Sequence, residues 1–253
     1  MIMIDLVYTL GKGSTWNDNE LRYSLRSVEK HLKNFRNIYI VGECPDWLIK
    51  QSKSEGAYVD GIIHVPVDDS GHASWNIANK LLHACALDEL SQKFLFMNDD
   101  FFFLKDVDAP TYPYYYDRYI SNHLRIYKVN WYNNYIQATN AELQENGLPT
   151  KYFDIHNPII YDKDLFPEVI NKFDFNKKLT VKSIYCNALN ISGIQMTDCK
   201  VIGWKKEDDL KAMLVDRHIF STGDQCLIDL PTRKSPTKEL LYKLFPNKSK
   251  YEQ

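Results

Sequence analysis

The sequence predicts an α/β fold: a mixed, mostly parallel sheet flanked by helices, in a single domain with two lobes. Short apolar runs alternate with segments of helical periodicity, which is typical of βαβ units. Residues 94–103 are apolar or aromatic except at positions 98–100, as expected of a strand buried on both faces. No low-complexity linker or internal repeat divides the 253 residues, a length that suits one large domain or two small ones.

The first strand and helix are the clearest elements. The apolar run Ile4–Leu10 predicts a strand that ends in a Gly-Lys-Gly-Ser loop at residues 11–14, without the spacing of a P-loop. A helix follows, because leucine and valine recur at helical intervals, and Asn17 and Glu20 have capping-box spacing at its start. The loop after the strand is therefore a candidate ligand loop, and its Lys12 is a candidate phosphate contact, although such a lysine is more often only solvated.

The rest of the chain continues the alternation and then becomes irregular. We expect strands at 37–42, 62–67 and 199–204, helices at 73–90, 166–173 and 180–189, edge strands or a long loop at 106–119, and a short surface helix with a frayed end at 238–253.

Composition excludes several function classes. The net charge is -2 and 25% of residues are charged, so no basic field indicates binding to nucleic acid or to a membrane surface. Five widely spaced cysteines without a Cys-x-x-Cys pair favour reduced thiols in a cytoplasmic protein and give no zinc site. We find neither a leader pattern nor a run long enough to span a membrane. The oligomeric state is not indicated.

Three polar residues, Asn98, Asp99 and Asp100, interrupt the apolar run. Burying two carboxylates costs several kcal/mol per ion unless a cation pairs with them. Open α/β sheets bind ligands at the carboxyl ends of their strands, where these side chains would lie. They are candidate ligands for Mg²⁺ or Mn²⁺ bridging a phosphorylated substrate. The alternative is a strand-to-turn junction with acidic caps.

Further candidates are cationic, amide and imidazole side chains near predicted strand ends. Arg22 and Arg26 lie four residues apart and face either an anionic ligand or solvent. Asn76 and Lys80 lie near the start of the second long helix, where the N-terminus attracts phosphate. The remaining candidate substrate contacts are Thr9, Trp131 and His218.

Two residues are candidate general bases. Asp224 follows a glycine and precedes an apolar stretch, which fits a helix start that presents a carboxylate. His156 lies in the polar cluster Asp-Ile-His-Asn-Pro and fits a base, an acid or a phosphate contact, although a lone histidine is more often structural. Together with Asp100, they are the predicted catalytic residues.

Several segments resemble conserved regions of the Stealth family. They are residues 5–9, 19–30, 38–41, 45–48, the Asn-Asp-Asp segment 94–100 and His156-Asn157-Pro158. The resemblance is clear over residues 4–105 and sparse beyond. It implies a GT-A-like, Rossmann-type core in which residues 1–105 form the half that binds a nucleotide-sugar donor. Residues 106–253 would then form the acceptor-binding half and the C-terminal helices. The chain departs from the family pattern in two loops, at residues 10–13 and 76–80.

Three functions fit these observations. The first is a metal-dependent glycosyltransferase that uses a nucleotide-diphosphate sugar, with the cation at residues 98–100 stabilising the leaving diphosphate. The second is Stealth-type transfer of a sugar 1-phosphate, with His156 in the central role. The third is a sugar- or nucleotide-binding module without turnover. The acceptor would be a glycan or another hydroxyl compound; net charge gives no indication of a nucleic acid.

Overall fold

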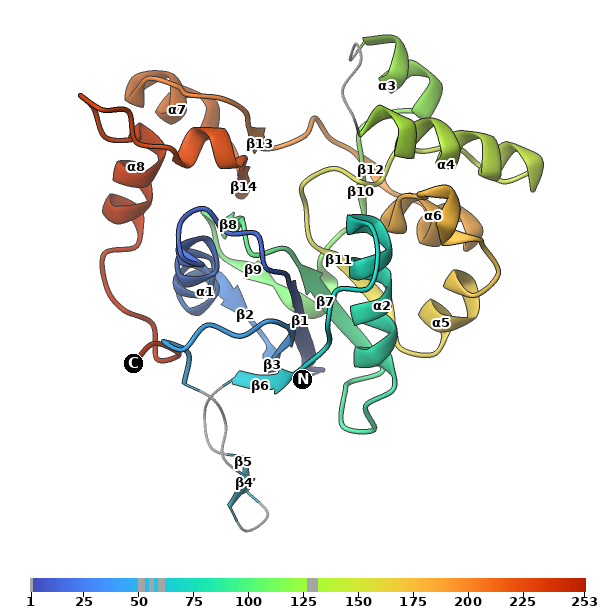
Figure 1. Ribbon diagram of the computed structural model, residues 1–253, viewed down its shortest axis with the longest axis horizontal. Coiled ribbons are helices and arrows are strands. Elements are labelled where there is room, and N and C mark those ends of the chain that lie inside the picture. Colours follow the sequence, from blue (N-terminus) through green and yellow to red (C-terminus); the bar gives the residue numbers. More distant parts are fainter. Residues whose placement is uncertain (1, 50–52, 55–56, 59–61, 127–131) are drawn as a thin grey trace.

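A five-stranded sheet forms the centre of the computed structural model, which describes residues 2–49, 53–54, 57–58, 62–126 and 132–253 (Figure 1). Its strand order is β11-β7-β1-β3-β6. The strands are β1 (Ile4–Leu10), β3 (Phe35–Gly42), β6 (Ile62–Val65), β7 (Lys93–Met97) and β11 (Ile159–Asp162). Only β11 runs antiparallel to its neighbour. The mixed, mostly parallel sheet predicted from the sequence is confirmed.

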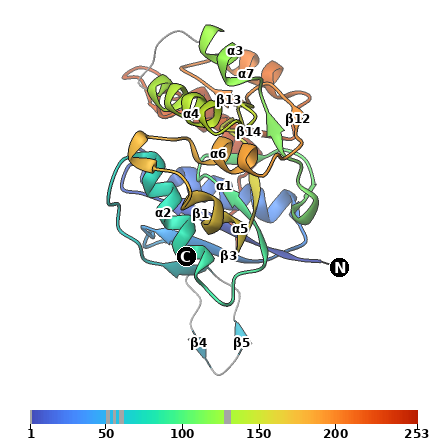
Figure 2. The ribbon, with the colours of Figure 1, turned by 90° about the vertical axis from the view of Figure 1, so that its right-hand side faces the viewer.

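Helices cover both faces of this sheet (Figures 1 and 2). The alternation of β1 decides which side chains each helix contacts. Leu6 and Tyr8 belong to the core cluster shared with α1 (Asn19–His31), whereas Val7 belongs to the cluster shared with α2 (Ala73–Cys85). The core cluster on the α2 side also includes buried residues of α5 (Leu165–Ile170) and α6 (Val181–Ala188).

The apolar run at 94–103 is not one strand, contrary to the prediction. The chain leaves the central sheet at Met97, turns at residues 98–100, and continues as β8 (Phe101–Phe103) in a second sheet of order β13-β14-β8. Its partners are β14 (Ile219–Thr222), antiparallel to β8, and β13 (Lys200–Val201), parallel to β14. Asn and Asp favour turns, and here that preference overrides the apolar pattern on either side.

Short elements complete the two lobes. Residues 106–119 contain two-residue strands and a 3-10 turn, as predicted for that irregular stretch. The remaining strands and helices are β2 (Leu32–Lys33), β4 (Lys53–Ser54), β5 (Ala57–Tyr58), β9 (Val107–Asp108), β10 (Tyr115–Tyr116), β12 (Ile194–Gln195), α3 (Ile120–Ile126), α4 (Asn133–Glu145), α7 (Glu207–Leu214), α8 (Pro236–Leu244), η1 (Ala109–Thr111), η2 (Phe175–Lys177) and η3 (Asp224–Leu227).

The predicted capping box at the start of α1 is wrong. The cap residue is Asp18, whose side chain makes no capping hydrogen bond, and Asn17 and Asp18 both have a left-handed backbone with φ of 54°. The hydroxyl of Ser14 organises this turn instead. Its Oγ accepts hydrogen bonds from the backbone amides of Trp16 and Asp18 and donates to Glu20 Oε2 at 2.8 Å. The Glu20 carboxylate is thereby turned back toward the loop after β1.

The end of the chain is not frayed, which corrects a second prediction. Tyr251 and Glu252 are buried, and the last residues run beside the segment before residue 50. Backbone hydrogen bonds join Ile49 N to Tyr251 O and Gln253 N to Trp47 O, both at 2.9 Å. In Figure 1 the C-terminus accordingly lies near β2 and β3, far from α7. No helix in the described ranges has the length and apolar character needed to cross a bilayer.

Candidate active site

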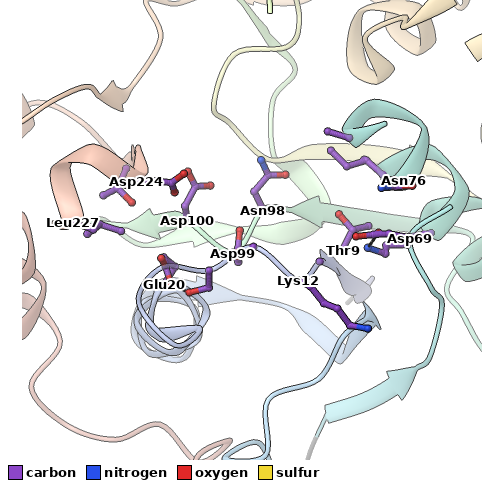
Figure 3. Close-up of a pocket in the computed structure, with 17 residues that line it drawn as sticks. Thr9, Lys12, Glu20, Asp69, Asn76, Asn98, Asp99, Asp100, Asp224 and Leu227 are labelled. Atoms are coloured by element: carbon purple, nitrogen blue, oxygen red, sulfur yellow. Dashed lines mark hydrogen bonds and ion pairs between the residues drawn. The ribbon is translucent and has the colours of Figure 1, made fainter. Parts of the chain in front are cut away.

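A cavity of about 440 Å³ opens at the carboxyl ends of β1 and β7 (Figure 3). This is the edge at which open α/β sheets bind ligands. Four segments contribute: the β1 end with its loop and α1, the α2 region, the turn after β7, and β14 with η3. The lining residues are Thr9, Gly11, Lys12, Gly13, Ser14, Glu20, Asp69, Ala73, Asn76, Ile77, Lys80, Asn98, Asp99, Asp100, Thr222, Asp224 and Leu227.

The cavity brings the predicted Asn-Asp-Asp motif together with Asp224, although 124 positions separate Asp224 from Asp100 in the numbering. Figure 3 shows Asp99, Asp100, Asp224 and Glu20 on the same side of the cavity. Burial, followed by the neighbouring carboxyls of Asp100 and Glu20, raises the pKa of Asp99 to about 8. A cation close to these carboxyl groups would offset their mutual repulsion and lower this pKa.

Asp100 has one satisfied and one unsatisfied carboxylate oxygen. Ser221 Oγ donates to Asp100 Oδ2 at 2.7 Å, whereas Oδ1 is buried and has no hydrogen-bond partner within the described part of the chain. A buried carboxylate oxygen without a partner is costly unless a donor or cation reaches it. The arrangement therefore leaves one oxygen of Asp100 available to a ligand of the cavity.

The acidic residues fit a hard divalent cation that is shared with a substrate. Asn98, Asp99 and Asp100 supply oxygen donors of the type that Mg²⁺ and Mn²⁺ prefer, and both ions often complete their shells with water and substrate phosphates. Across residues 2–253, apart from the gaps given above, no three His, Cys, Asp or Glu side chains converge to hold an ion by themselves. A closed, purely protein-bound metal site is thus not formed by the described residues.

Lys12 and Lys80 both line the cavity and are both already paired with a carboxylate. Lys12 Nζ lies 3.1 Å from Glu43 Oε1 on the surface, and this contact raises the pKa of Lys12. Lys80 is buried, and its Nζ donates to Leu10 O at 2.8 Å and to Asp69 Oδ1 at 2.5 Å. Lys80 therefore fastens the loop after β1 to the loop before α2.

Of the other predicted substrate contacts, Thr9 and Asn76 line the cavity. The amide of Asn76 also fixes the loop before α2: Oδ1 accepts from the backbone amides of Ser70 and Gly71, and Nδ2 donates to Gly71 O. Its place in the site is thus rigidly defined. Trp131 lies outside the described residues.

Arg22 and Arg26 do not reach the cavity. Both face the buried carboxylate of Glu252, with Arg26 Nε and Nη2 each 2.7 Å from its oxygens and Arg22 Nε 3.6 Å away. The Arg22 guanidinium also lies over the Trp47 ring. Of the two orientations predicted for this face of α1, toward a ligand or toward solvent, the structure shows neither, because the C-terminal segment covers it.

His218 is likewise set back from the cavity. Its Nε2 lies 3.0 Å from the hydroxyl of Tyr112, which donates to Asn157 Oδ1. Burial, followed by the charges of Lys105 and Arg217, lowers the pKa of His218. Through Tyr112 and Asn157, His218 supports the segment that carries His156.

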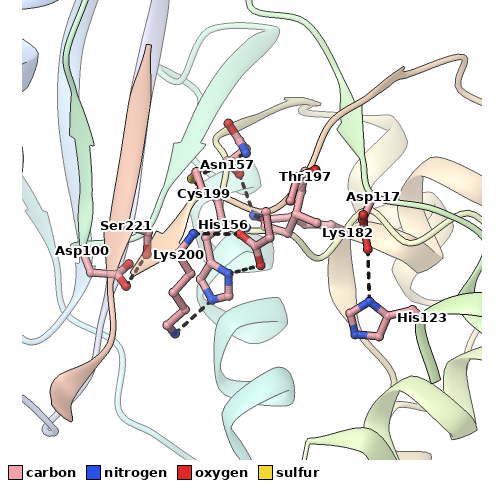
Figure 4. Close-up of polar contacts among 12 residues, drawn as sticks. Asp100, Asp117, His123, His156, Asn157, Lys182, Thr197, Cys199, Lys200 and Ser221 are labelled. Atoms are coloured by element: carbon pink, nitrogen blue, oxygen red, sulfur yellow. Dashed lines mark hydrogen bonds and ion pairs between the residues drawn. The ribbon is translucent and has the colours of Figure 1, made fainter. Parts of the chain in front are cut away.

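His156 belongs to a polar cluster on the second lobe (Figure 4). Its Nδ1 lies 2.8 Å from Asp198 Oδ2 and its Nε2 lies 3.0 Å from Lys200 Nζ. The buried ammonium of Lys182 donates to the carbonyl oxygens of Ile155 and Asn157, on either side of the histidine. His156 does not line the cavity. Both of its ring nitrogens and the carbonyl groups on either side of it have hydrogen-bond partners, which fix its position.

Several site residues escaped the sequence analysis. Glu20 was predicted only as part of a helix cap, and Asp69 was given no role. No local sequence pattern marks Ser221 or Asp198 as a site residue. Ser221 lies 121 residues from its partner Asp100, and Asp198 lies 42 residues from its partner His156. Pairing at such separation leaves no local pattern in the sequence.

Comparison with known proteins finds a family match over part of the chain. Residues 15–121 match the family model described as Stealth protein CR2, conserved region 2, which spans Glu20, the Asn-Asp-Asp turn and α2. Over these residues the chain is similar to the Stealth family, and the resemblance seen in the sequence is confirmed.

Two curated proteins are similar to this chain over part of their length. The N-acetylglucosamine-1-phosphotransferase subunits alpha/beta of Mus musculus are 37% identical over 102 residues, which is 37% of this chain and 8% of that protein. An exopolysaccharide phosphotransferase of Nocardia farcinica is 29% identical over 189 residues, which is 69% of this chain and 36% of that protein. The alignments thus span well under half the length of these relatives.

The fold has a counterpart among solved structures. A galactosyltransferase, LgtC, in complex with donor and acceptor sugar analogs superposes with a TM-score of 0.53 at 11% identity, covering 99% of this chain and 98% of that chain. The predicted GT-A-like fold is confirmed.

Proposed function

We propose that this chain transfers a sugar 1-phosphate from a nucleotide-diphosphate sugar to a hydroxyl acceptor. One observation carries the proposal: the family match covers the Asn-Asp-Asp turn of the cavity, and the curated proteins similar to this chain are named phosphotransferases. The acidic cavity, the histidine cluster and the fold are each consistent with such a reaction.

The charge of the cavity supports a requirement for a divalent cation. Five acidic side chains line it (Glu20, Asp69, Asp99, Asp100 and Asp224), against two lysines that are both paired with carboxylates. A diphosphate entering this cavity meets like charge, which costs free energy at close range. We propose that Asp100, with Asp99 and Asn98, holds Mg²⁺ or Mn²⁺, which would neutralise charge on the diphosphate when bound.

The protein groups would share the remaining work. The acceptor oxygen forms a bond to the phosphorus next to the sugar, the bond from that phosphorus to the nucleoside monophosphate breaks, and the acceptor proton passes to a base. His156 is suited to this role because Asp198 fixes its orientation through Nδ1. Ser221 orients Asp100, and Asn76 and Thr9 bound the space for the donor.

One observation favours a second reaction. Asp224 lines the cavity on the same side as Asp100, whereas His156 does not line it. A carboxylate base inside the cavity suits direct glycosyl transfer, in which the attacked atom is the anomeric carbon and a nucleoside diphosphate leaves.

The released nucleotide separates these reactions. The purified protein is incubated with UDP-N-acetylglucosamine, Mn²⁺ and a panel of sugar acceptors, and the nucleotide is identified by mass. We expect UMP, because sugar-phosphate transfer cleaves the diphosphate. Release of UDP would replace the proposal with glycosyl transfer. If the protein binds UDP but produces neither nucleotide from UDP-N-acetylglucosamine, it would act as a binding module without turnover.

A further inference from the structure

The ammonium group of Lys200 lies beside the acidic cavity, and it is not paired with a carboxylate of the described residues. The Lys200 ammonium approaches the neighbouring His156 Nε2 at 3.0 Å, and among the described residues no Asp or Glu oxygen lies within 4.0 Å of it. Lys12 and Lys80, the two lysines inside the cavity, are in contrast both paired with carboxylates.

The hydrogen bonds around His156 define which nitrogen carries the proton. Although burial would raise the pKa of Asp198, the His156 ring and the backbone amides of His156 and Lys200 hold it at about 2, so this carboxylate only accepts. His156 Nδ1 must therefore donate to it. A lysine ammonium only donates, so Nε2 is the acceptor toward Lys200. In this arrangement the lone pair that a general base needs is occupied by Lys200.

The position of Lys200 connects it to the cavity. In the second sheet Lys200 is the register partner of Ser221, which holds Asp100, and Val201 is the partner of Thr222, which lines the cavity. The lysine stem passes over Gly223, where an added Cβ would lie 3.3 Å from Lys200 Cε. Gly223 directly precedes Asp224. Figure 4 shows the Lys200 side chain on the side of His156 that faces Asp100.

The buried Lys182 and the partly exposed Asp198 hold this cluster in place. Lys182 donates to the carbonyl oxygens on both sides of His156, and its ammonium lies 5.2 Å from the centre of the Phe101 ring, directly after the Asn-Asp-Asp turn. Asp198 accepts from the backbone amides of His156 and Lys200 as well as from the ring. The backbone of the cluster is thus fixed, while the long Lys200 side chain retains rotatable bonds.

We propose that Lys200 and His156 form a phosphate subsite next to the cation site, and that Lys200 exchanges partners during the reaction. When the donor binds, the Lys200 ammonium leaves His156 Nε2 and donates to a non-bridging oxygen of the phosphate that carries the sugar. His156 Nε2 is then free to accept the proton of the acceptor hydroxyl as the new O–P bond forms and the bond to the nucleoside monophosphate breaks. This inference rests on the proposed function for its second half; the phosphate contact stands without it.

The phosphate contact is tested by binding. UDP serves as the probe, because its β-phosphate stands in for the sugar phosphate. A charge-assisted hydrogen bond to phosphate is worth about 1.5–3 kcal/mol, so Lys200→Met should raise the Kd for UDP by about 10- to 100-fold. Lys200→Arg should lose far less. Lys93→Met, at an exposed position at the opposite end of β7, is the matched control and should leave the Kd unchanged.

The exchange of partners is tested by the nitrogen resonances of His156. In long-range ¹H–¹⁵N spectra of the wild-type protein, UDP should shift Nε2 while Nδ1 keeps its proton. In Lys200→Met the Nε2 signal should already differ in the absence of UDP. Turnover of UDP-N-acetylglucosamine should fall about 100-fold in kcat for this variant, since the contact strengthens as charge develops in the transition state.

Each result of these experiments supports or contradicts a different part of the proposal. An unchanged Kd for UDP in a folded Lys200→Met protein overturns the phosphate subsite. If Lys200→Met does not fold, Lys200→Gln, which removes the charge but keeps a polar end, replaces it with the same expectations. Release of UDP instead of UMP by the wild-type protein contradicts the proposed function, but a weakened Kd in the variant still supports the subsite. A weakened Kd without any effect on Nε2 overturns the partner exchange.

Discussion

Ser221 and Asp100 join the two lobes at the candidate active site. The hydroxyl of Ser221, on β14, donates to Asp100 Oδ2 at 2.7 Å, and it leaves Oδ1 of the same carboxylate buried without a partner in the described chain. The second sheet thus orients a side chain that the first sheet delivers. Binding of a cation to Asp100 would therefore also depend on the contact between β14 and the turn after β7.

Replacing Asp100 by asparagine should abolish cation binding without unfolding the protein. Asparagine keeps an oxygen for the Ser221 hydroxyl and has the same shape, but it removes the charge that a divalent ion requires. We expect Mn²⁺ binding, measured by titration calorimetry, to disappear and turnover to fall by about 100-fold or more. Asp88→Asn, at an exposed position, is the control. Normal Mn²⁺ affinity in Asp100→Asn would place the cation elsewhere.

The sequence predicted the central sheet well because its signals are local. Strand β1 has the expected bounds, since six of its seven residues are apolar or strand-forming and a glycine loop follows. The run 94–103 was interpreted as one strand because nothing nearby shows that residues 101–103 pair with β14, more than a hundred residues later. Composition and periodicity report the burial of a strand, but not the sheet to which it belongs.

Side-chain partners were harder to predict than elements. The acidic turn was found because it interrupts an apolar run, and Asp224 because it follows a glycine at a predicted helix start. Arg22 and Arg26 were expected to face either an anionic ligand or solvent. Their anion is Glu252, which lies 226 residues after Arg26 in a segment predicted to be frayed. A helix face shows which residues point together and not what covers them.

Replacing Glu252 by glutamine should destabilise the fold by about 3 kcal/mol. The carboxylate is buried and accepts two hydrogen bonds from Arg26 and two from Ser249, so its removal leaves a buried guanidinium without a counter-charge. Urea denaturation measures the free energy of unfolding. Glu168→Gln, which breaks an exposed pair with Lys172, should cost less than about 0.5 kcal/mol. Equal losses would mean that the C-terminal segment contributes little.

The same carboxylate predicts a dependence of stability on pH. Burial alone would raise the pKa of Glu252, but the hydrogen bonds from Arg26 and Ser249 lower it below its usual value. The folded state therefore binds this proton more weakly than the unfolded state, whose pKa is about 4.3. The contribution is fully present above that pH and is lost as the pH falls through the folded pKa. The difference in unfolding free energy between wild type and Glu252→Gln should shrink below about pH 4; a constant difference from pH 7 to 3 would contradict this.

Gly42, which lies against Lys80 behind the cavity lining, should tolerate an added side chain less well than Gly147. The φ of Gly42 is +116°, and an added Cβ would lie 2.1 Å from Leu10 O and 2.7 Å from Lys80 Cε. Gly147 also has positive φ, at +66°, but nothing lies within 4 Å of its Cβ position. Both alanine variants pay about 1 kcal/mol for the backbone conformation. The difference between them therefore measures the packing of Lys80 against the loop after β1.

We expect Gly42→Ala to lose about 3 kcal/mol or more in urea denaturation, since overpacking adds to the backbone cost, and Gly147→Ala about 1 kcal/mol. Lys80 and the Leu10 carbonyl must move apart to admit the methyl group, and this shifts the Gly11–Ser14 side of the cavity. Gly42→Ala should therefore also weaken UDP binding at temperatures where it remains folded, and Gly147→Ala should not. Equal stability losses, or an unaltered UDP affinity in Gly42→Ala, would show that Lys80 does not hold the donor side of the cavity in place.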